Sequence, residues 1–150
     1  MKILVPFDIS AASRAAFSHA LSLTDQSEGD LLNVVPTADA GEDAPNLARE
    51  AGIKLRAFRR DSHAPDGRCK VSVRVGIPFH EIGQIAENKQ CDLIVLGRHD
   101  PDGEQAEDGY ISDRVLRYAK SPVLLVRAPT ALNRTDESAS PAQRRLRGFP

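Results

Sequence analysis

The sequence predicts a single α/β domain built on a parallel sheet. Short apolar runs that suit strands buried on both faces alternate with segments of helical spacing, in the order strand–helix four times and then a last strand. The length of 150 residues is also that of one domain with one core. Right-handed crossovers would place helices on both faces of the sheet. Periodicity alone leaves the order of the five strands open.

The first quarter of the chain is expected to form a strand, a helix and a second strand. Residues 2–7 contain the apolar run Ile-Leu-Val, and Asp8 follows the carboxyl end of this strand. Ser10 can cap the next helix, because its hydroxyl can accept from a free N–H of the first turn. The second strand is expected at residues 31–35, closed by Pro36, which cannot donate to a ladder. The helix between them would bury one stripe of residues, namely Ala12, Ala16, Phe17, Ala20, Leu21 and Leu23.

The middle of the chain is expected to hold a loop, a helix and an edge strand. Residues 36–45 lack apolar periodicity and contain Pro and Gly, which is typical of a loop. Residues 71–75 alternate with period two, as a strand exposed on one face does, so this strand should lie near a sheet edge. A helix is expected from about residue 46 to residue 60, with its basic residues mostly on a solvated face; these are Arg49, Lys54, Arg56, Arg59 and Arg60.

The last part of the domain is expected to add two helices and two strands. Pro78 suits the first turn of the third helix, and the fourth strand at residues 93–96 ends at Gly97, where a ligand loop would begin. A fourth helix should run from about residue 110 to residue 119 and a fifth strand over residues 123–126. The side chains expected to face inward are Phe79, Ile82, Ile85 and Ala86 in the third helix, and Ile111, Val115, Leu116 and Ala119 in the fourth.

The domain is expected to cover residues 1–128. Beyond it the composition changes to Ala, Pro, Ser and Arg without an apolar period, which indicates a flexible tail over residues 129–150. The net charge of −1 provides no global field that would attract nucleic acid or an anionic membrane, so we expect neither partner. The first apolar run is too short for a signal peptide or a membrane span. We therefore expect a soluble, cytoplasmic protein.

Five segments of the chain follow one another in the order of a known family. They read KILVPFDIS at 2–10, LLNVV at 31–35, VGIP at 75–78, DLIVLG at 92–97 and SPVLLV at 121–126. Each is common by itself, but together they resemble the universal stress protein family over residues 2–127. The resemblance implies a Rossmann-like fold of the adenine nucleotide alpha hydrolase type, with strand order 3-2-1-4-5. It also implies a ligand crevice between the first and fourth strands.

The stretch after the fourth strand departs from the motif of the family's nucleotide binders. Those proteins carry Gly-x2-Gly-x9-Gly-Ser/Thr, in which the glycines let the backbone approach the phosphates and the last pair opens a helix whose N-terminus favours anions. Here the span from Gly97 to Gly109 is one residue short, Asp100 stands at the second glycine, and Tyr110 stands at the hydroxyl position. The span is also acidic, and each close carboxylate–phosphate pair costs about 1 kcal/mol; its acidic residues are Asp100, Asp102, Glu104, Glu107 and Asp108.

Other residues match positions that hold the adenine and ribose in the family's binders. Asp8 could accept hydrogen bonds from ribose hydroxyls. An acidic residue before a helix is, however, also favoured by the helix dipole without any ligand. No catalytic or metal-binding residue is expected. No cofactor is expected either, and ATP or ADP with Mg²⁺ is the alternative. By the resemblance, the candidate cofactor-binding residues are Pro6, Asp8, Val34, Leu96, Gly97, Gly109, Tyr110 and Ile111.

The leading hypothesis is a non-enzymatic stress-response protein that acts as a homodimer and has a degenerate nucleotide-binding loop. Dimerisation is expected because the resemblance places the apolar strand Val123 to Val126 at a sheet edge, which invites pairing with a second chain. The alternative is an ATP-binding stress protein with weak or no ATPase activity. An ATP-using hydrolase or transferase, a receiver domain and an EF-hand calcium site lack their motifs.

Overall fold

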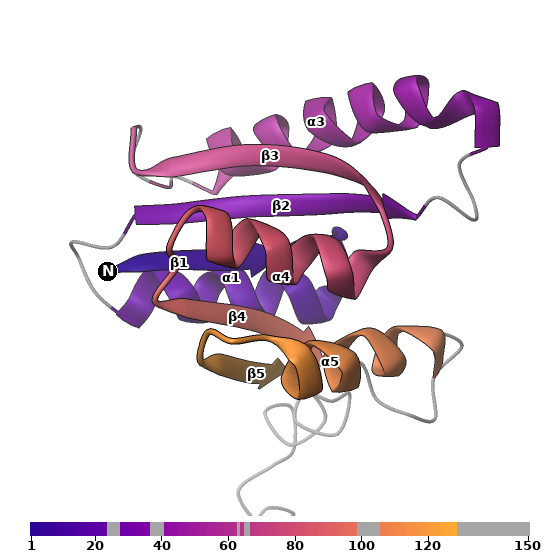
Figure 1. The fold of residues 1–150 in the computed structure, drawn as a ribbon. Coiled ribbons are helices and arrows are strands. Elements are labelled where there is room, and N and C mark those ends of the chain that lie inside the picture. Colours follow the sequence, from indigo (N-terminus) through magenta and orange to yellow (C-terminus); the bar gives the residue numbers. More distant parts are fainter. Residues whose placement is uncertain (24–27, 37–40, 63, 65–66, 99–105, 129–150) are drawn as a thin grey trace, which may run out of the picture.

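Five parallel strands form the centre of the fold (Figure 1). The strands pair in the order β3-β2-β1-β4-β5, which confirms both the predicted fold class and the order implied by the resemblance. The computed structural model describes residues 1–23, 28–36, 41–62, 64, 67–98 and 106–128, and within 106–110 only the backbone. The strands are β1 (Lys2–Pro6), β2 (Glu28–Pro36), β3 (Cys69–Gly76), β4 (Leu93–Arg98) and β5 (Val123–Arg127).

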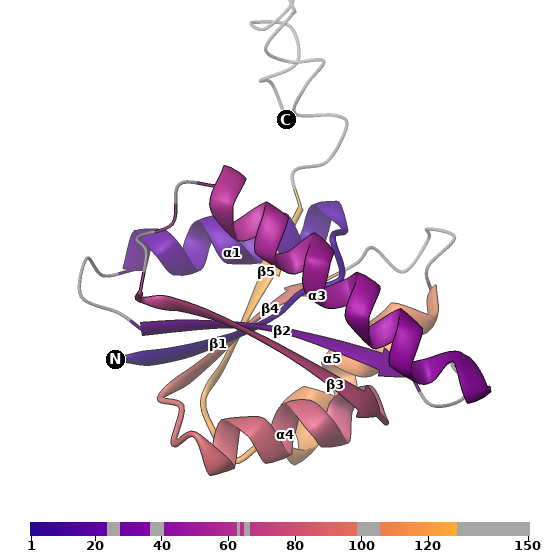
Figure 2. The same ribbon diagram turned by 90° about the horizontal axis from the view of Figure 1, so that it is seen from above.

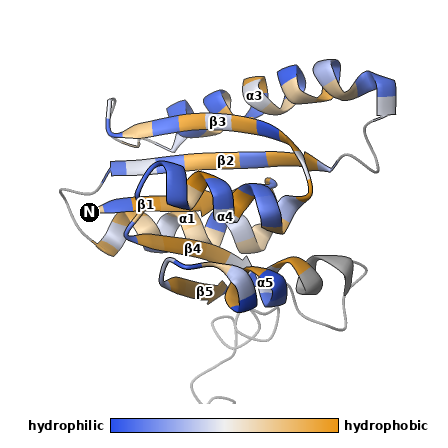
Figure 3. Cartoon of the chain, in the orientation of Figure 1, coloured by the Kyte–Doolittle hydropathy of each residue, from blue (hydrophilic) through white to orange (hydrophobic). Residues whose placement is uncertain are grey.

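Helices cover both faces of this sheet, as the crossover rule predicts. Figure 2 shows α1 (Ala11–Leu23) and α3 (Ala44–Asp61) on one face, and α4 (Pro78–Asn88) and α5 (Ala106–Tyr118) on the other. A short 3-10 turn, η1 (Gly41–Asp43), precedes α3. Strands β1, β4 and β5 are apolar along most of their length, whereas β3 and the helices alternate between hydrophobic and hydrophilic residues (Figure 3). The core therefore has two layers, one on each side of the sheet.

Neighbouring residues of a strand point to opposite faces, so β1 supplies both layers. Ile3 and Val5 pack with Phe17 of α1 and Leu55 of α3, whereas Leu4 belongs to the layer under α4 and α5. In that second layer the buried partners of Leu4 are Leu32, Ile82, Ile85, Ala86, Ile94, Leu96 and Val115. The central strand thus has its apolar side chains buried on both faces.

Three leucines expected to face inward are exposed instead. Leu21 is 41 % exposed, Leu116 is 47 % exposed, and Leu23, the last residue of α1, is 37 % exposed. Leu21 and Leu116 each follow the last fully buried residue of their helix, which turns them roughly 100° around the axis from it. Ser13 and Ser112 are buried on these helices, although their polar side chains gave no such indication.

Several element ends differ from those predicted. β4 continues through Gly97 and Arg98, which pair with β5, so Gly97 does not end this strand as expected. Helix α5 begins at Ala106, four residues before the expected start, and Gly109 and Tyr110 lie inside it. Pairing with a neighbouring strand sets where a strand ends, and a side-chain pattern does not reveal it. The expected tail at 129–150 and the acidic positions 100, 102 and 104 lie outside the described residues.

A partly buried ion pair fastens the end of α4 to the sheet. Lys89 Nζ donates to the carboxylate of Asp30 on β2 and, at 3.0 Å, to Ser72 Oγ on β3. Ser72 Oγ in turn donates to Asp30 Oδ1 at 3.0 Å. Such a cluster is costly to break once buried, because removal of one partner leaves the other charge uncompensated.

The two cysteines are free thiols in this fold. Burial raises the pKa of the Cys69 thiol to about 11, and burial likewise raises the pKa of Cys91. The thiolate is the reactive form of cysteine, so neither side chain is set up as a nucleophile at neutral pH.

The backbone of β4 passes very close to the first turn of α1 at Gly97. A Cβ atom at this position would lie 2.4 Å from the carbonyl carbon of Ala12, 2.5 Å from its oxygen and 2.7 Å from the amide nitrogen of Ser13. These are backbone atoms, which cannot rotate away as a side chain can. Glycine at position 97 is therefore required by packing, whatever else the residue does.

We expect Gly97→Ala to lower the free energy of unfolding by about 3 kcal/mol or more, because the added methyl group overlaps rigid backbone. The matched control is Gly83→Ala in α4, where a Cβ meets nothing within 4 Å. The control should raise stability by up to about 1 kcal/mol, since alanine is the better helix former. Urea unfolding of both variants measures the difference. Equal stability of the two variants would contradict the close approach of β4 to α1.

Candidate functional site

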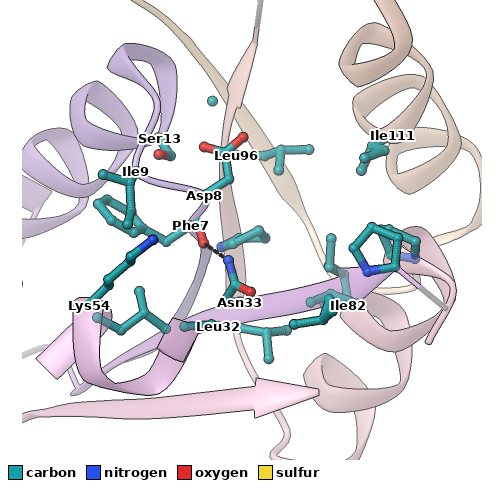
Figure 4. A pocket seen from close by; sticks show the side chains of 18 of the residues that line it. Phe7, Asp8, Ile9, Ser13, Leu32, Asn33, Lys54, Ile82, Leu96 and Ile111 are labelled. Atoms are coloured by element: carbon teal, nitrogen blue, oxygen red, sulfur yellow. Dashed lines mark hydrogen bonds between the residues drawn. The ribbon is translucent and has the colours of Figure 1, made fainter. Parts of the chain in front are cut away.

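A cavity of about 460 Å³ opens at the carboxyl ends of β1, β2 and β4 (Figure 4). Small-molecule sites have volumes of about 300–1,000 Å³, so this cavity is large enough for a nucleoside. Its walls come from the ends of these strands and from residues of α1, α3, α4 and α5. The chain reverses its strand order between β1 and β4, which is where open α/β sheets hold ligands.

Six of the eight candidate residues lie around this one cavity. They come from four separate segments, and the carboxyl-end geometry of the sheet brings them together. Gly109 and Tyr110 are not among the lining residues described; both lie in α5, and their side chains are outside the description. That the lining residues contact a ligand remains a prediction. The six are Pro6, Asp8, Val34, Leu96, Gly97 and Ile111.

Helix α3 forms a wall of the cavity that the sequence analysis did not assign to a site. Glu50 and Lys54 both line it, although the basic residues of this helix were interpreted as a solvated face. A signal was present, since Leu47, Glu50, Ala51 and Lys54 have the i, i+3, i+4, i+7 spacing of one helix face. Figure 4 shows the Lys54 ammonium directed towards the side of the cavity where Phe7 and Ile9 lie.

Asp8 has a local structural role as well as a place in the cavity. Its Oδ1 accepts a hydrogen bond from the Ser10 N–H at 3.0 Å, which closes the turn after β1. Ser10 Oγ accepts from the Ser13 N–H at 3.1 Å, which confirms Ser10 as the helix cap. The Asp8 side chain remains exposed while it lines the cavity. Its carboxylate is thus held in place by the start of α1.

The floor of the cavity is tied together between β1 and β2. The side-chain amide of Asn33 donates to the Phe7 carbonyl oxygen at 2.8 Å, as the dashed line in Figure 4 shows. The Phe7 N–H donates to the Leu32 carbonyl oxygen, also at 2.8 Å. These bonds extend the pairing of the two strands by one residue beyond the end of β1 and hold Phe7 and Asp8 against β2.

Three phenylalanines hold α3 against β1 and α1. The ring centroids of Phe7 and Phe58 are 4.3 Å apart, and those of Phe17 and Phe58 are 5.1 Å apart. The Arg14 guanidinium lies 5.7 Å from the Phe58 ring centroid, and its Nε donates to the Ile9 carbonyl at 3.2 Å. Aromatic and cation–π contacts of this kind each contribute about 1 kcal/mol. The wall formed by α3 is therefore built before any ligand arrives.

Ile9 has a strained backbone at the edge of the cavity. Its φ is 69°, in the left-handed region that a β-branched residue rarely adopts. The conformation is sustained by the Asp8–Ser10 turn and by the Arg14 bond to the Ile9 carbonyl. Strain of this sort is concentrated at binding sites, where it directs a side chain that an ordinary backbone would place elsewhere.

The cavity is mainly apolar, with few charges. Of the lining residues that the structure describes, two are acidic, Asp8 and Glu50, and one is basic, Lys54. Such a lining suits a flat apolar group that carries a few polar atoms. Within the described parts of the chain, no three His, Cys, Asp or Glu residues are grouped to hold a metal ion. No helix within those parts is long and apolar enough to cross a membrane.

Comparisons with known proteins agree on one family. The model of the universal stress protein family matches residues 1–127. A universal stress protein of Methanocaldococcus jannaschii is 27 % identical over 140 residues, which cover 85 % of this chain and 82 % of the relative. The solved structure of the universal stress protein UspA from Lactobacillus plantarum is 28 % identical and covers 85 % of this chain and 97 % of its own, with a TM-score of 0.68.

Two further solved structures share the fold and contain nucleotides. One is a universal stress protein in complex with cAMP, at 19 % identity and a TM-score of 0.65, covering 86 % of this chain and 98 % of its own. The other is a universal stress protein family protein from Arabidopsis thaliana with AMP bound, at 19 % identity and a TM-score of 0.60, covering 94 % and 97 %. At this identity the likeness concerns the fold.

Alanine is usually less destabilising than glycine as a substitution, and the strain at Ile9 predicts the opposite order of stability at this position. Left-handed backbone costs an L-residue about 1–2 kcal/mol, and glycine escapes this cost. Ile9→Gly should therefore be more stable than Ile9→Ala by about 1 kcal/mol, although both lose the same side-chain contacts beyond Cβ. Chemical unfolding of the two variants measures the difference. If the alanine variant is as stable as the glycine variant or more so, the left-handed conformation is wrong.

Proposed function

Because this chain belongs to the universal stress protein family, we propose that it is a non-enzymatic stress-response protein whose cavity binds a nucleoside or a nucleoside monophosphate. The observation that supports this most is the apolar cavity at the β1–β4 switch point, with Asp8 held at its edge. Pro6 and Val34 flank the place where a base would lie, and the Asp8 carboxylate can accept from sugar hydroxyls. The same fold holds AMP in one relative and cAMP in another.

A triphosphate fits this site less well than a monophosphate. Gly97 is required by the contact with α1, so its presence is not a sign of a phosphate loop. Helix α5 begins three residues before Gly109, so this glycine does not open the helix as it does in the motif. The sequence of the intervening span is acidic, and each carboxylate close to a bound phosphate costs about 1 kcal/mol of binding free energy. We infer that the nucleotide loop is degenerate.

The non-enzymatic role is supported by the chemistry of the lining. Of the described residues around the cavity, none is a histidine or a cysteine, and the titratable groups are Asp8, Glu50 and Lys54. The Asp8 carboxylate closes the turn after β1 through the Ser10 N–H. Binding, rather than turnover, is what such a lining provides.

A second candidate function is that of an ATP-binding stress protein with weak or no ATPase activity. It is favoured by the positions of Pro6, Asp8 and Val34, which all line the cavity and match the adenine and ribose positions of the family's binders. Mg²⁺ would offset part of the repulsion between the triphosphate and the acidic span. The two candidates differ in how affinity changes with the number of phosphates.

We expect calorimetric titration to give AMP at least about fivefold tighter binding than ATP with Mg²⁺, because the described lining has one cation against two carboxylates and about 1 kcal/mol of repulsion on the additional phosphates corresponds to that ratio. The ATP dissociation constant should be weaker than about 100 μM, or about 5.5 kcal/mol of binding free energy. The control is Asp8→Asn, which should weaken AMP and adenosine binding alike by removing a charged acceptor.

Tighter binding of ATP than of AMP would contradict the degenerate loop and favour the second candidate. Phosphate release from ATP above a buffer blank, abolished in Asp8→Ala, would contradict the non-enzymatic role. Absence of binding by adenosine, AMP and ATP would reject the cavity as a nucleoside site.

We also propose that the protein is a homodimer joined along β5. Among the described elements β5 pairs only with β4, so its outer edge offers unpaired backbone groups. Val123 and Leu125 lie partly buried on one face of the sheet, and Leu124 and Val126 lie partly buried on the other. An apolar edge strand that is partly exposed on both faces is suited to pairing with a second copy.

Light scattering at micromolar concentration should give the mass of a dimer for the wild-type protein. Val126→Lys should shift it to monomer, because a charge on an edge strand opposes pairing. The matched control is Val75→Lys on β3 at the opposite edge, which should remain a dimer. A monomeric wild-type protein, or an unchanged mass for Val126→Lys, would reject β5 as the interface.

A further inference from the structure

We propose that Lys54 is the anion-binding side chain of the cavity, so that a bound nucleoside monophosphate places its phosphate beside helix α3 rather than at the start of α5. This inference rests on the proposed nucleoside site and adds the orientation of the ligand in it. It also names a specificity-determining residue on a helix outside the nucleotide motif.

The charges around the cavity support this orientation. A phosphate monoester has a charge of about −1.5 to −2 at neutral pH. Of the described lining residues, Lys54 is the only cation, whereas Asp8 and Glu50 are anions. A phosphate next to Asp8 is repelled, whereas a phosphate next to Lys54 is attracted by the ammonium, an attraction that Glu50, one helical turn away on the same face of α3, opposes in part. Asp8 can instead accept hydrogen bonds from the sugar hydroxyls, which are neutral donors.

Lys54 is available for a ligand. It has neither a hydrogen-bond nor an ion-pair partner among the residues that the structure describes, whereas Lys89 is bound to Asp30 and Lys120 to Glu87. Its side chain is exposed, and Figure 4 shows its ammonium directed to the side of the cavity where Phe7 and Ile9 lie. An exposed ammonium that reaches the cavity can meet a phosphate without first breaking another ion pair.

The position of Lys54 is also well determined. Leu55, the next residue of α3, is buried in the core, and Phe58 packs on Phe7 and Phe17. The backbone that bears Lys54 is thus fixed against β1 and α1. Binding then needs only the side chain to settle, which keeps the entropic cost of capture low.

The opposite end of the cavity is less suited to an anion. Only the first four N–H groups of a helix lack a partner within the helix, so with α5 beginning at Ala106 the amide of Tyr110 lies beyond the free ones. The sequence that leads into α5 is acidic, a composition that disfavours a phosphate. At the end of β4, Gly97 is packed against the backbone of α1.

The test compares adenosine with AMP, since the two ligands differ only in the phosphate. Calorimetric titrations use the wild-type protein, Lys54→Met, Lys54→Arg and the control Lys70→Met, whose lysine is exposed on β3 and away from the cavity. We expect the wild-type protein to bind AMP roughly tenfold tighter than adenosine, because a hydrogen bond between charged groups contributes about that ratio in affinity. Lys54→Met should reduce this ratio to about one, whereas Lys54→Arg and Lys70→Met should keep it.

The outcomes separate this inference from the proposed function. If adenosine and AMP bind and Lys54→Met leaves their ratio unchanged, the assignment of Lys54 is wrong and the nucleoside site stands. A wild-type ratio near one would also overturn the assignment. If neither ligand binds, the nucleoside site itself is wrong and this inference fails with it.

Higher salt should weaken AMP binding and leave adenosine binding unchanged.

Discussion

The contact between β4 and the first turn of α1 at Gly97 determines the shape of the cavity. Because only a hydrogen atom fits there, the carboxyl end of β4 lies directly beside the turn that carries Asp8 and the capping Ser10. A bulkier residue would push the two apart and open the cavity to water. The same glycine resembles the start of a phosphate loop, but close packing is sufficient to explain it.

The cavity combines a rigid apolar frame with a few charges at its edge. The Asn33 bond to the Phe7 carbonyl and the stacking of Phe58 on Phe7 hold β1, β2 and α3 together without a ligand. The strained Ile9 is held by the same surroundings. In the proposed nucleoside site, the apolar frame selects the ligand by shape, Asp8 lies near α1, and Glu50 and Lys54 lie on α3. We propose that these charges determine the orientation of a bound nucleotide.

Much of the fold could be predicted from local pattern, because a parallel sheet buries its strands on both faces and leaves apolar runs in the sequence. The strand order came from the resemblance, since periodicity says nothing of neighbours. Gly97 was wrongly expected to end β4, because pairing with Val126 extends the strand. Leu116 was expected to face inward and Ser112 was not, because both were judged by polarity. Their angular positions around the helix axis decide which of them faces the core. Lys54 was missed because a basic residue next to a buried one was taken as solvated, while its place beside the cavity depends on how α3 crosses the sheet.

The most direct test is a crystal structure of the protein with AMP. The account predicts the adenosine in the cavity between β1 and β4, with the ribose hydroxyls near Asp8 and a phosphate oxygen within about 4 Å of Lys54 Nζ, the usual limit for an ion pair. A phosphate at the first turn of α5, with the adenosine in the cavity, would contradict the assigned orientation. A nucleotide bound elsewhere, with the cavity empty, would contradict the site itself.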